Sequence, residues 1–521
     1  MQAITSALSR PLYSVAATRQ IEQQAAAGLP PHALMQRAGL AVARLTLALA
    51  PHARRIWIAC GPGNNGGDGF EAALHLRQWG KAVVVTWTGP HHDPKKRPGD
   101  AQAAMKRALA AGVTIATEPP QDFDFCIDAL LGIGAKAASL AAPAPVNAGL
   151  IAQWLQLMHR SGQPVLAVDV PTGLDADTGF SGIPQSEPQS ATNLIATDVH
   201  STRARSRFTL SLLTLKPGLF TAHGRDLAGQ VWFDDLGVPA PQSVPPGALL
   251  LGADRALPPA RVHAPHASHK GSFGDVAVVG GESTATASMA GAALLAARAA
   301  LHAGAGRVFV ALLGQPALTL DTQQPELMFR SPDVLDLKQQ VVVCGCGGGA
   351  SVKTVLARVL SSATRAVLDA DALNAIAADT QLQTQLKARK RRGYSTILTP
   401  HPLEAARLLG STSAQVQASR LTAAQQLAEQ FQCVVALKGS GTVIAAPARV
   451  PAINPTGNAR LATAGTGDVL AGMMGALLAS GENAFDAACS AVFTHGKRAD
   501  DWPGHEHHPP LTASALATFA N

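Results

Sequence analysis

Short apolar segments rich in β-branched residues alternate with longer segments rich in alanine and leucine along most of the 521-residue chain. This alternation is typical of an α/β protein with a mostly parallel sheet. Helices are expected where apolar residues recur every three or four positions, at residues 21–27, 34–48, 70–79, 288–302 and 469–479. Strands are expected at residues 55–60, 82–87, 123–127, 165–170, 276–279, 308–312, 341–344, 366–368, 395–398 and 434–437.

Two stretches interrupt this pattern. The proline-rich residues 239–247 (PAPQSVPPG) separate one complete α/β series from the start of another, and they predict a boundary between domains. Residues 181–205 have little apolar content and no period, which indicates a surface excursion. Length alone suggests three or four domains. The boundary instead indicates two large α/β domains, residues 1–240 and 247–521, and the family resemblances described below imply a three-layer α/β/α architecture for each.

Composition narrows the class of protein. With 47% hydrophobic and 15% charged residues, the chain is not disordered. The formal charge of +7 is spread out, and the one dense basic run, residues 387–392 (KARKRR), lacks interleaved aromatic residues, so we expect no nucleic-acid binding. The charge suits small ligands rich in phosphate.

Cysteines and apolar runs indicate the compartment. Six scattered cysteines, four of them in or at the end of apolar runs, fit reduced thiols and not a disulfide framework. We see no export signal and no uncharged apolar run of the ~18 residues that a membrane span needs. These features predict a cytoplasmic protein without a membrane partner.

A glycine-rich segment, residues 61–69 (GPGNNGGDG), follows the first long strand and precedes a helix expected to begin near Phe70. This order brings backbone N–H groups and a helix N-terminus together, which favours a bound phosphate. Gly61, Gly63 and Gly66 fit G-x-G-x-x-G, but the strand at residues 82–87 lacks the carboxylate at its end that dinucleotide-binding dehydrogenases use. A purely structural tight turn is the alternative.

Polar residues also follow the next two strands of the first domain. Asp128 lies at the end of one strand, and Asp169 and Thr172 lie at the end of another. Ligands of open parallel sheets bind at the carboxyl ends of strands, so these side chains can converge with Asn65. Buried oxygens that converge need a cation or a ligand donor between them. Each aspartate alone could instead cap a turn.

The first half resembles the NAD(P)H-hydrate epimerase family over residues 12–238, through the motifs GPGNNGGDG, DALLGIG, VDVPTGLDADTG and LKPGL. The resemblance implies a Rossmann-like fold, a potassium ion held by Asn65, Asp128 and Thr172, and Asp169 as the acid/base at C6 of the hydrated nicotinamide. The segment GIGAKAAS departs from the family pattern. The implied contacts to the hydrated nucleotide are Asn64, Asn65, Gly66, Gly67, Asp68, Gly132, Ile133, Gly134, Ala135, Lys136, Ala137, Ala138 and Asp169.

The second half carries its own glycine-rich segment, residues 464–468 (AGTGD), at the start of a helix. Small residues let the backbone approach a phosphoryl group, and Asp468 could accept a proton from an attacking hydroxyl. Asp468 could also serve the helix dipole alone. The segments ALKGSGT, TPHP and DADALN follow other strands and suit a nucleotide-dependent phosphorylation, although the chain has no G-x-x-x-x-G-K-[ST] motif.

This half resembles the ribokinase-like ADP/ATP-dependent NAD(P)H-hydrate dehydratases from about residue 250 onward, through HKGSFG, LDADALN, LTPHPLE, ALKGSGT and AGTGDVLAG. Where that family has GPGLG, this chain has GCGGG at residues 345–349. The resemblance implies catalysis by Asp468 and dependence on ADP, or ATP, with Mg²⁺. The implied hydrate contacts are Ala292, Gly347, His401 and Asp468, and the implied nucleotide contacts are Lys438, Gly439, Ser440, Gly441, Thr442 and Gly467.

The two resemblances together predict a fused repair enzyme for hydrated NADH and NADPH. The first domain would interconvert the R and S epimers, and the second would dehydrate the S epimer with ADP as co-substrate, giving AMP and phosphate. We also expect a homo-oligomer. One alternative is a ribokinase-like kinase of a small alcohol, which stops at phosphorylation. Another is a first domain that serves only as a nucleotide- or RNA-binding scaffold.

Overall fold

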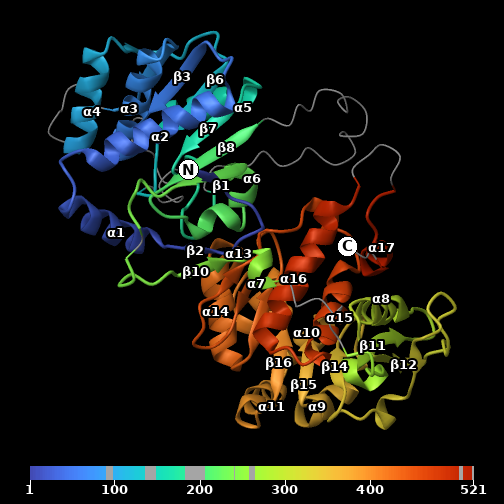
Figure 1. Cartoon of the computed structure of the whole chain (residues 1–521). Helices are drawn as coiled ribbons and strands as arrows, with labels where there is room; N and C mark the ends of the chain where they lie inside the picture. Colours follow the sequence, from blue (N-terminus) through green and yellow to red (C-terminus); the bar gives the residue numbers. More distant parts are fainter. Residues whose placement is uncertain are drawn as a thin grey trace. The chain divides into compact units, whose positions relative to one another are not determined.

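The computed structural model describes residues 1–89, 98–134, 148–181, 206–239, 241–256, 265–503 and 509–518. The chain forms two compact units, Met1–Thr5 with Pro11–Gly247 and Ser6–Arg10 with Ala248–Asn521 (Figure 1). Both are built from a mostly parallel sheet and helices, which confirms the predicted two-domain α/β class.

The sheet of the first unit runs in the order β1-β9-β8-β7-β6-β3-β4-β5, and neighbouring strands are parallel except for β1 against β9. Counted from β3, this is the Rossmann order 3-2-1-4-5-6 with two added strands, β9 and β1, beside β8. The order reverses between β3 and β6, the place where such sheets bind ligands. The strands are β1 (Gln2–Ala3), β3 (Arg55–Cys60), β4 (Ala82–Trp87), β5 (Thr114–Ala116), β6 (Phe125–Ala129), β7 (Val165–Val168), β8 (Arg207–Leu212) and β9 (Gln230–Asp234).

Helices cover both faces of this sheet. Because side chains alternate along a strand, Ile56, Ile58 and Cys60 of β3 pack into one apolar core. Trp57 and Ala59 pack into another core with α5 on the opposite face. The helices are α1 (Val15–Ala27), α2 (Ala33–Leu49), α3 (Asn64–Gln78), α4 (Gly99–Ala110), α5 (Ala148–Arg160) and α6 (Gly224–Ala228).

Among the described residues, the second sheet runs in the order β13-β12-β11-β14-β15-β16-β17-β18-β19-β10-β2. All of these strands belong to the second unit except β2, which contributes only Arg10 to it. Strands β13 to β17 are parallel, and β18 is antiparallel to both neighbours. The strands are β2 (Arg10–Leu12), β10 (Ala248–Leu250), β11 (Asp275–Ser283), β12 (Arg307–Gly314), β13 (Met328–Phe329), β14 (Val341–Cys344), β15 (Arg365–Leu368), β16 (Ser395–Leu398), β17 (Val434–Leu437), β18 (Val443–Ala445) and β19 (Ala452–Ile453).

The main apolar core of this unit joins α8, α15 and α16 to the sheet, and valines of β11 and β14 lie within it. The helices are α7 (Ala253–Ala256), α8 (Ala290–His302), α9 (Val352–Ser362), α10 (Ala370–Ala378), α11 (Thr380–Arg391), α12 (Pro402–Leu409), α13 (Ser413–Ala418), α14 (Arg420–Phe431), α15 (Thr466–Ala479), α16 (Ala484–Asp501) and α17 (Ala513–Thr518).

The second unit includes Ser6–Arg10, a segment that the sequence pattern placed in the first domain. Ser9 holds it there, because its backbone N and its Oγ donate to Asp254 Oδ1 at 2.7 and 2.8 Å. The Ser9 Oγ in turn accepts a hydrogen bond from Gly252 N at 2.9 Å. These partners are more than 240 positions away along the chain, so no local pattern indicates them.

Helix α3 begins at Asn64, six residues before the start expected near Phe70. The expected start is wrong because glycines are more common in loops than in helices, whereas these glycines let a helix pack closely against the end of β3. A Cβ on Gly66 would lie 2.0 Å from Gly61 O, and one on Gly69 would lie 2.7 Å from Cys60 Sγ. The glycines therefore seat the first turn of α3 directly against the end of β3.

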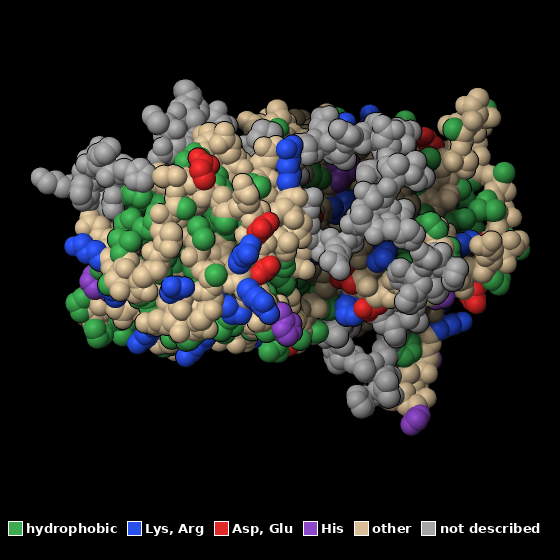
Figure 2. All heavy atoms as spheres, turned by 90° about the horizontal axis from the view of Figure 1, so that it is seen from above, with side chains coloured by type: hydrophobic (Ala, Val, Ile, Leu, Met, Phe, Trp, Pro, Cys, Tyr) green, Lys and Arg blue, Asp and Glu red, His purple; other side chains and the backbone are tan. Residues whose placement is uncertain are grey.

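The surface charges and the cysteines are arranged as the composition predicts, with basic residues spread out (Figure 2) and cysteines unpaired. On the face in Figure 2, basic side chains lie in several separate places, some of them beside acidic ones. All six cysteines are buried and unpaired. Among the described helices, none combines the length and the apolar character needed to cross a bilayer.

Candidate active sites

The first site is a cavity of about 950 Å³ at the point where the strand order of the first sheet reverses. The start of α3 forms one wall, where Gly63, Asn64, Asn65 and Asp68 line the cavity. Of the two asparagines, Asn64 is exposed to solvent and Asn65 is buried. Backbone N–H groups at a helix start favour negative charge, so this wall suits a phosphorylated ligand.

Asp169 lines the same cavity from the end of β7. Its backbone is in the left-handed region with φ 67°, an uncommon conformation for a residue other than glycine. Its Oδ1 accepts hydrogen bonds from Leu212 N at 3.0 Å and from Lys216 Nζ. Lys216 is fully buried, and its Nζ also donates to Leu212 O at 2.7 Å. The lysine thus fixes one oxygen of a carboxylate that faces the cavity.

Carboxyl groups gather on this side of the cavity. Burial raises the pKa of Asp68 well above its usual value, and the nearby Asp169 and Glu22 carboxylates raise it further. Burial, followed by Asp169, also raises the pKa of Glu22. Lys216 opposes both shifts. Burial and mutual repulsion in this site therefore favour the protonated form of these carboxyl groups more than water does.

Asn65, Asp128 and Thr172, the residues expected to hold potassium, are all buried. Thr172 Oγ1 donates to Asp128 Oδ1 at 2.7 Å and accepts from Leu131 N at 3.0 Å. The next residue, Gly132, packs against Asn65, because a Cβ on Gly132 would lie 3.4 Å from Asn65 Oδ1.

The set of oxygens fits a cation. Both polar atoms of the Asn65 amide are buried without a hydrogen-bond partner among the described residues. A buried amide without a partner is unfavourable, and a bound ion or water is a common reason for one. Burial raises the pKa of Asp128 above its usual value, although hydrogen bonds from Thr172 and Leu130 oppose the shift. A cation beside this carboxylate would favour its charged form.

The other residues expected to contact the hydrated nucleotide are only partly described. Gly66 and Gly67 are buried in the first turn of α3, and Gly132, Ile133 and Gly134 line the cavity. Ala135, Lys136, Ala137 and Ala138 lie outside the described residues.

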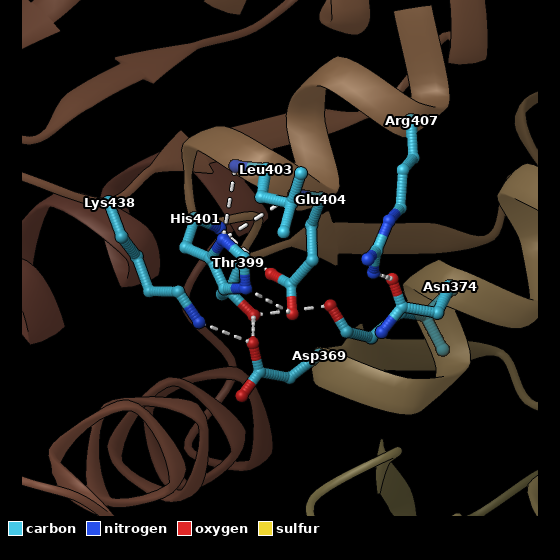
Figure 3. A network of polar contacts seen from close by, with 9 residues as sticks. Asp369, Asn374, Thr399, His401, Leu403, Glu404, Arg407 and Lys438 are labelled. Carbon is cyan, nitrogen blue, oxygen red and sulfur yellow. Dashed lines mark hydrogen bonds and ion pairs between the residues drawn. The ribbon is translucent and has the colours of Figure 1, made fainter. Parts of the chain in front are cut away.

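The second site lies at the carboxyl ends of β15, β16 and β17 (Figure 3). Asp369, which follows β15, is buried, and its Oδ1 accepts from Thr399 Oγ1 and from Lys438 Nζ, each at 2.7 Å. Burial lowers the pKa of Lys438, but the charges of Asp369 and Glu404 outweigh that effect and raise it. Lys438 is thus a fixed cation at the expected nucleotide loop.

His401 caps α12 beside this pair. Its Nδ1 accepts hydrogen bonds from Leu403 N and Glu404 N at 3.1 and 3.4 Å, while its own backbone N donates to Glu404 Oε2 at 2.8 Å (Figure 3). Burial, with the charge of Lys438, lowers the pKa of His401. A neutral imidazole with Nδ1 engaged has its proton on Nε2, which is then a hydrogen-bond donor.

Asp468 lies in the first turn of α15, as expected. Burial and the charge of Asp369 raise its pKa to about 6, while a hydrogen bond from Cys346 and the charge of Lys438 lower it. A carboxylate with a pKa close to neutral is suited to act as a general base. Gly467 lies beside the lysine, since a Cβ there would be 3.3 Å from Lys438 Nζ.

Ala292 and Gly347, both expected hydrate contacts, are in contact: a Cβ on Gly347 would lie 2.9 Å from Ala292 Cβ. Gly347 follows Cys346, whose Sγ lies within 4.8 Å of a carboxylate oxygen of Asp468, so these residues lie on one side of the site. The expected nucleotide contacts Gly439, Ser440, Gly441 and Thr442 form the loop between β17 and β18.

Among the described residues, side chains alone do not form a site suited to magnesium. One cluster brings three possible metal ligands together, Cys346, Asp369 and Asp468, with atoms within 4.8 Å of one another. Asp369 is already bonded to Lys438 and Thr399, and a thiol is a poor ligand for Mg²⁺, which prefers oxygen. Any Mg²⁺ would have to arrive with the phosphates of the nucleotide.

Comparisons with known proteins agree with the two halves of the chain. Residues 31–218 match the family described as YjeF-related protein N-terminus, and residues 276–519 match the NAD(P)H-hydrate dehydratase family. The bifunctional NAD(P)H-hydrate repair enzyme Nnr of Escherichia coli (strain K12) is 34% identical over 506 residues, which cover 92% of this chain and 88% of that protein. The chain belongs to the family of bifunctional NAD(P)H-hydrate repair enzymes. The resemblances noted in both halves of the sequence are thereby confirmed.

Other relatives match about half of the chain. The ADP-dependent (S)-NAD(P)H-hydrate dehydratase of Neisseria meningitidis is 44% identical over 245 residues, covering 45% of this chain and 78% of that protein. A solved ADP/ATP-dependent NAD(P)H-hydrate dehydratase of Bacillus subtilis, co-crystallised with ATP/Mg²⁺, is 31% identical. It covers 50% of this chain and 92% of that chain, with a TM-score of 0.41.

Sequence reasoning missed several residues of the two sites. Lys216 is part of the LKPGL motif, but nothing local indicates that it is buried against Asp169. Arg420 is buried at the start of α14, where it donates to Leu437 O and Lys438 O at 3.1 and 3.2 Å and so supports the nucleotide loop. Glu404, by contrast, is part of the LTPHPLE motif noted in the sequence, and its carboxylate accepts a hydrogen bond from the backbone N of His401.

Proposed function

We propose that this chain repairs hydrated NADH and NADPH in two steps, one in each unit. The first unit interconverts the R and S epimers at C6 of the hydrated nicotinamide. The second unit dehydrates the S epimer with a nucleotide as co-substrate. The observation that carries the proposal is the match to bifunctional repair enzymes across both units, with an acidic residue at a strand end or helix start in each site.

In the first unit Asp169 acts as the acid/base at C6. Its Oδ1 is held by Leu212 N and Lys216, which leaves Oδ2 to take and return a proton. The start of α3, from Asn64 to Asp68, and residues 132–138 contact the nucleotide. Asn65, Asp128 and Thr172 would hold a potassium ion, whose charge would help to bind and orient the anionic ligand.

In the second unit Asp468 accepts the proton of the C6 hydroxyl. The oxygen of that hydroxyl attacks the terminal phosphorus of ADP, and AMP leaves. Phosphate then leaves C6 with the bonding electron pair while C5 loses a proton, which restores the C5–C6 double bond. Lys438 to Thr442 and Gly467 bind the nucleotide, and Ala292, Gly347 and His401 bind the hydrate. The pKa of about 6 keeps Asp468 mostly ionised at neutral pH.

The test is to incubate the full chain with a mixture of hydrated NADH epimers and ADP, and to follow the absorbance of reduced nicotinamide. Complete recovery with AMP and phosphate as products supports the proposal. A phosphorylated product that accumulates without recovery would contradict it and indicate a kinase. ATP in place of ADP, and hydrated NADPH in place of hydrated NADH, define the preferred substrates.

A further inference from the structure

The loop at residues 345–349 reads GCGGG and carries one side chain that can donate a hydrogen bond, that of Cys346. Cys346 is fully buried after the end of β14. Its backbone O accepts from Gly281 N at 2.9 Å, and a Cβ on Gly280 would lie only 2.2 Å from that same oxygen. The close contact with the end of β11 fixes the backbone of this loop, and with it the direction of the Cys346 side chain.

The Cys346 thiol lies close to Asp468, the proposed general base of the second site. Cys346 Sγ and oxygens of Asp369 and Asp468 lie within 4.8 Å of one another. The thiol lies next to the Asp468 carboxylate, and its S–H group lowers the pKa of Asp468. Burial, with the charges of Asp468 and Asp369, raises the pKa of Cys346 well above its usual value, so the thiol keeps its proton and remains a donor.

The other charged neighbours of Asp468 do not orient it in this way. Asp369 and Asp371 repel its carboxylate, and Lys438, the neighbouring cation, is bonded to Asp369 at 2.7 Å. On α16, His495 bonds to Thr466 O at 2.9 Å, and burial lowers its pKa to about 4, so it is uncharged at neutral pH.

We propose that Cys346 is a positioning residue for the dehydration step: its thiol holds the Asp468 carboxylate toward the hydroxyl from which Asp468 takes the proton. The inference rests on the proposed function of the second unit, and it assigns a task in that unit to Cys346. A donor also stabilises the charged form of the carboxylate, so its loss should raise the pKa of Asp468 above about 6.

The first experiment compares pH profiles of kcat/KM for NADH formation in the full chain, using Cys346→Ala and Cys346→Ser. In Cys346→Ala the acidic limb should move up by about half a pH unit to one pH unit, with kcat falling and the KM for ADP unchanged. Cys346→Ser keeps a hydrogen-bond donor, so its acidic limb should lie at the same pH as that of wild type. The matched control is Cys344→Ala, a buried cysteine of β14 two residues away, which should leave the profile unchanged.

The second experiment detects the hydrogen bond without any turnover. The difference infrared spectrum between wild type and Cys346→Ser isolates the S–H stretching band of Cys346, and this band should shift in Asp468→Asn. An unshifted band, an acidic limb that stays in place in Cys346→Ala, or a serine variant that behaves like alanine would overturn the proposal. A wild type that forms no NADH would instead refute the proposed function, while the infrared result would still decide whether the thiol contacts Asp468.

Discussion

Removing the charge of Lys216 should strongly destabilise the first unit. Lys216 is fully buried and bonds to Asp169 Oδ1, to Leu212 O and, at 3.5 Å, to Ser211 Oγ. Lys216→Met leaves a buried carboxylate without its cation, which costs about 3–5 kcal/mol of unfolding free energy. The double variant with Asp169→Asn removes both charges and should lie within about 1–2 kcal/mol of wild type. The double variant is thus predicted to be more stable than Lys216→Met alone, by about 1–4 kcal/mol.

Urea unfolding followed by tryptophan fluorescence reports on the unit concerned, because five of the six tryptophans, all except Trp502, lie in the first unit. Lys106→Met, at an exposed position of α4, is the matched control and should change stability by at most about 0.5 kcal/mol. Epimerisation should be lost in Lys216→Met. A loss of stability below about 1 kcal/mol together with intact epimerisation would refute the role given to this ion pair.

Three further predictions concern packing, potassium and acid stability. Gly66→Ala places a Cβ 2.0 Å from Gly61 O and should lower the free energy of unfolding of the first unit by about 1–3 kcal/mol in urea titrations. Gly63→Ala is the control, because a Cβ there has no neighbour within 4 Å and should change stability little. Equal effects of the two substitutions would contradict the packing of α3. Replacing K⁺ by a bulky organic cation should slow epimerisation in wild type but not in Asn65→Ala, as measured by NMR of the two epimers; a wild type indifferent to K⁺ would contradict the site. The pKa of buried His495 is lowered from 6.5 to about 4, so the unfolded state binds the proton first and stability should fall by about 3 kcal/mol as the pH drops from 6.5 to 4. His495→Gln, which keeps a donor, should flatten this slope in urea titrations at several pH values, and an unchanged slope would show that other groups cause it.

Strands and strand-end chemistry could be predicted because both follow from local patterns. The apolar runs at residues 55–60, 82–87 and 341–344 coincide with β3, β4 and β14. The rule that parallel strands present their carboxyl ends at one edge brings Asp369 and Lys438 together, as the 2.7 Å ion pair shows.

The remaining features depend on distant partners. The early start of α3 escapes prediction, since its glycines have low helix propensity and their packing against β3 outweighs it. Lys216 and Arg420 are buried although such residues are usually exposed, and only the folded chain supplies their acceptors. The placement of Ser6–Arg10 likewise rests on contacts with Gly252 and Asp254.

The division of labour between the two units is tested most directly by following the two epimers of hydrated NADH separately in Asp169→Asn and Asp468→Asn, with ADP present. In Asp169→Asn the S epimer should be converted to NADH while the R epimer remains. In Asp468→Asn no NADH should form, yet the two epimers should still interconvert. Loss of both reactions in either variant, with the fold intact, would contradict the account of two sites with separate tasks.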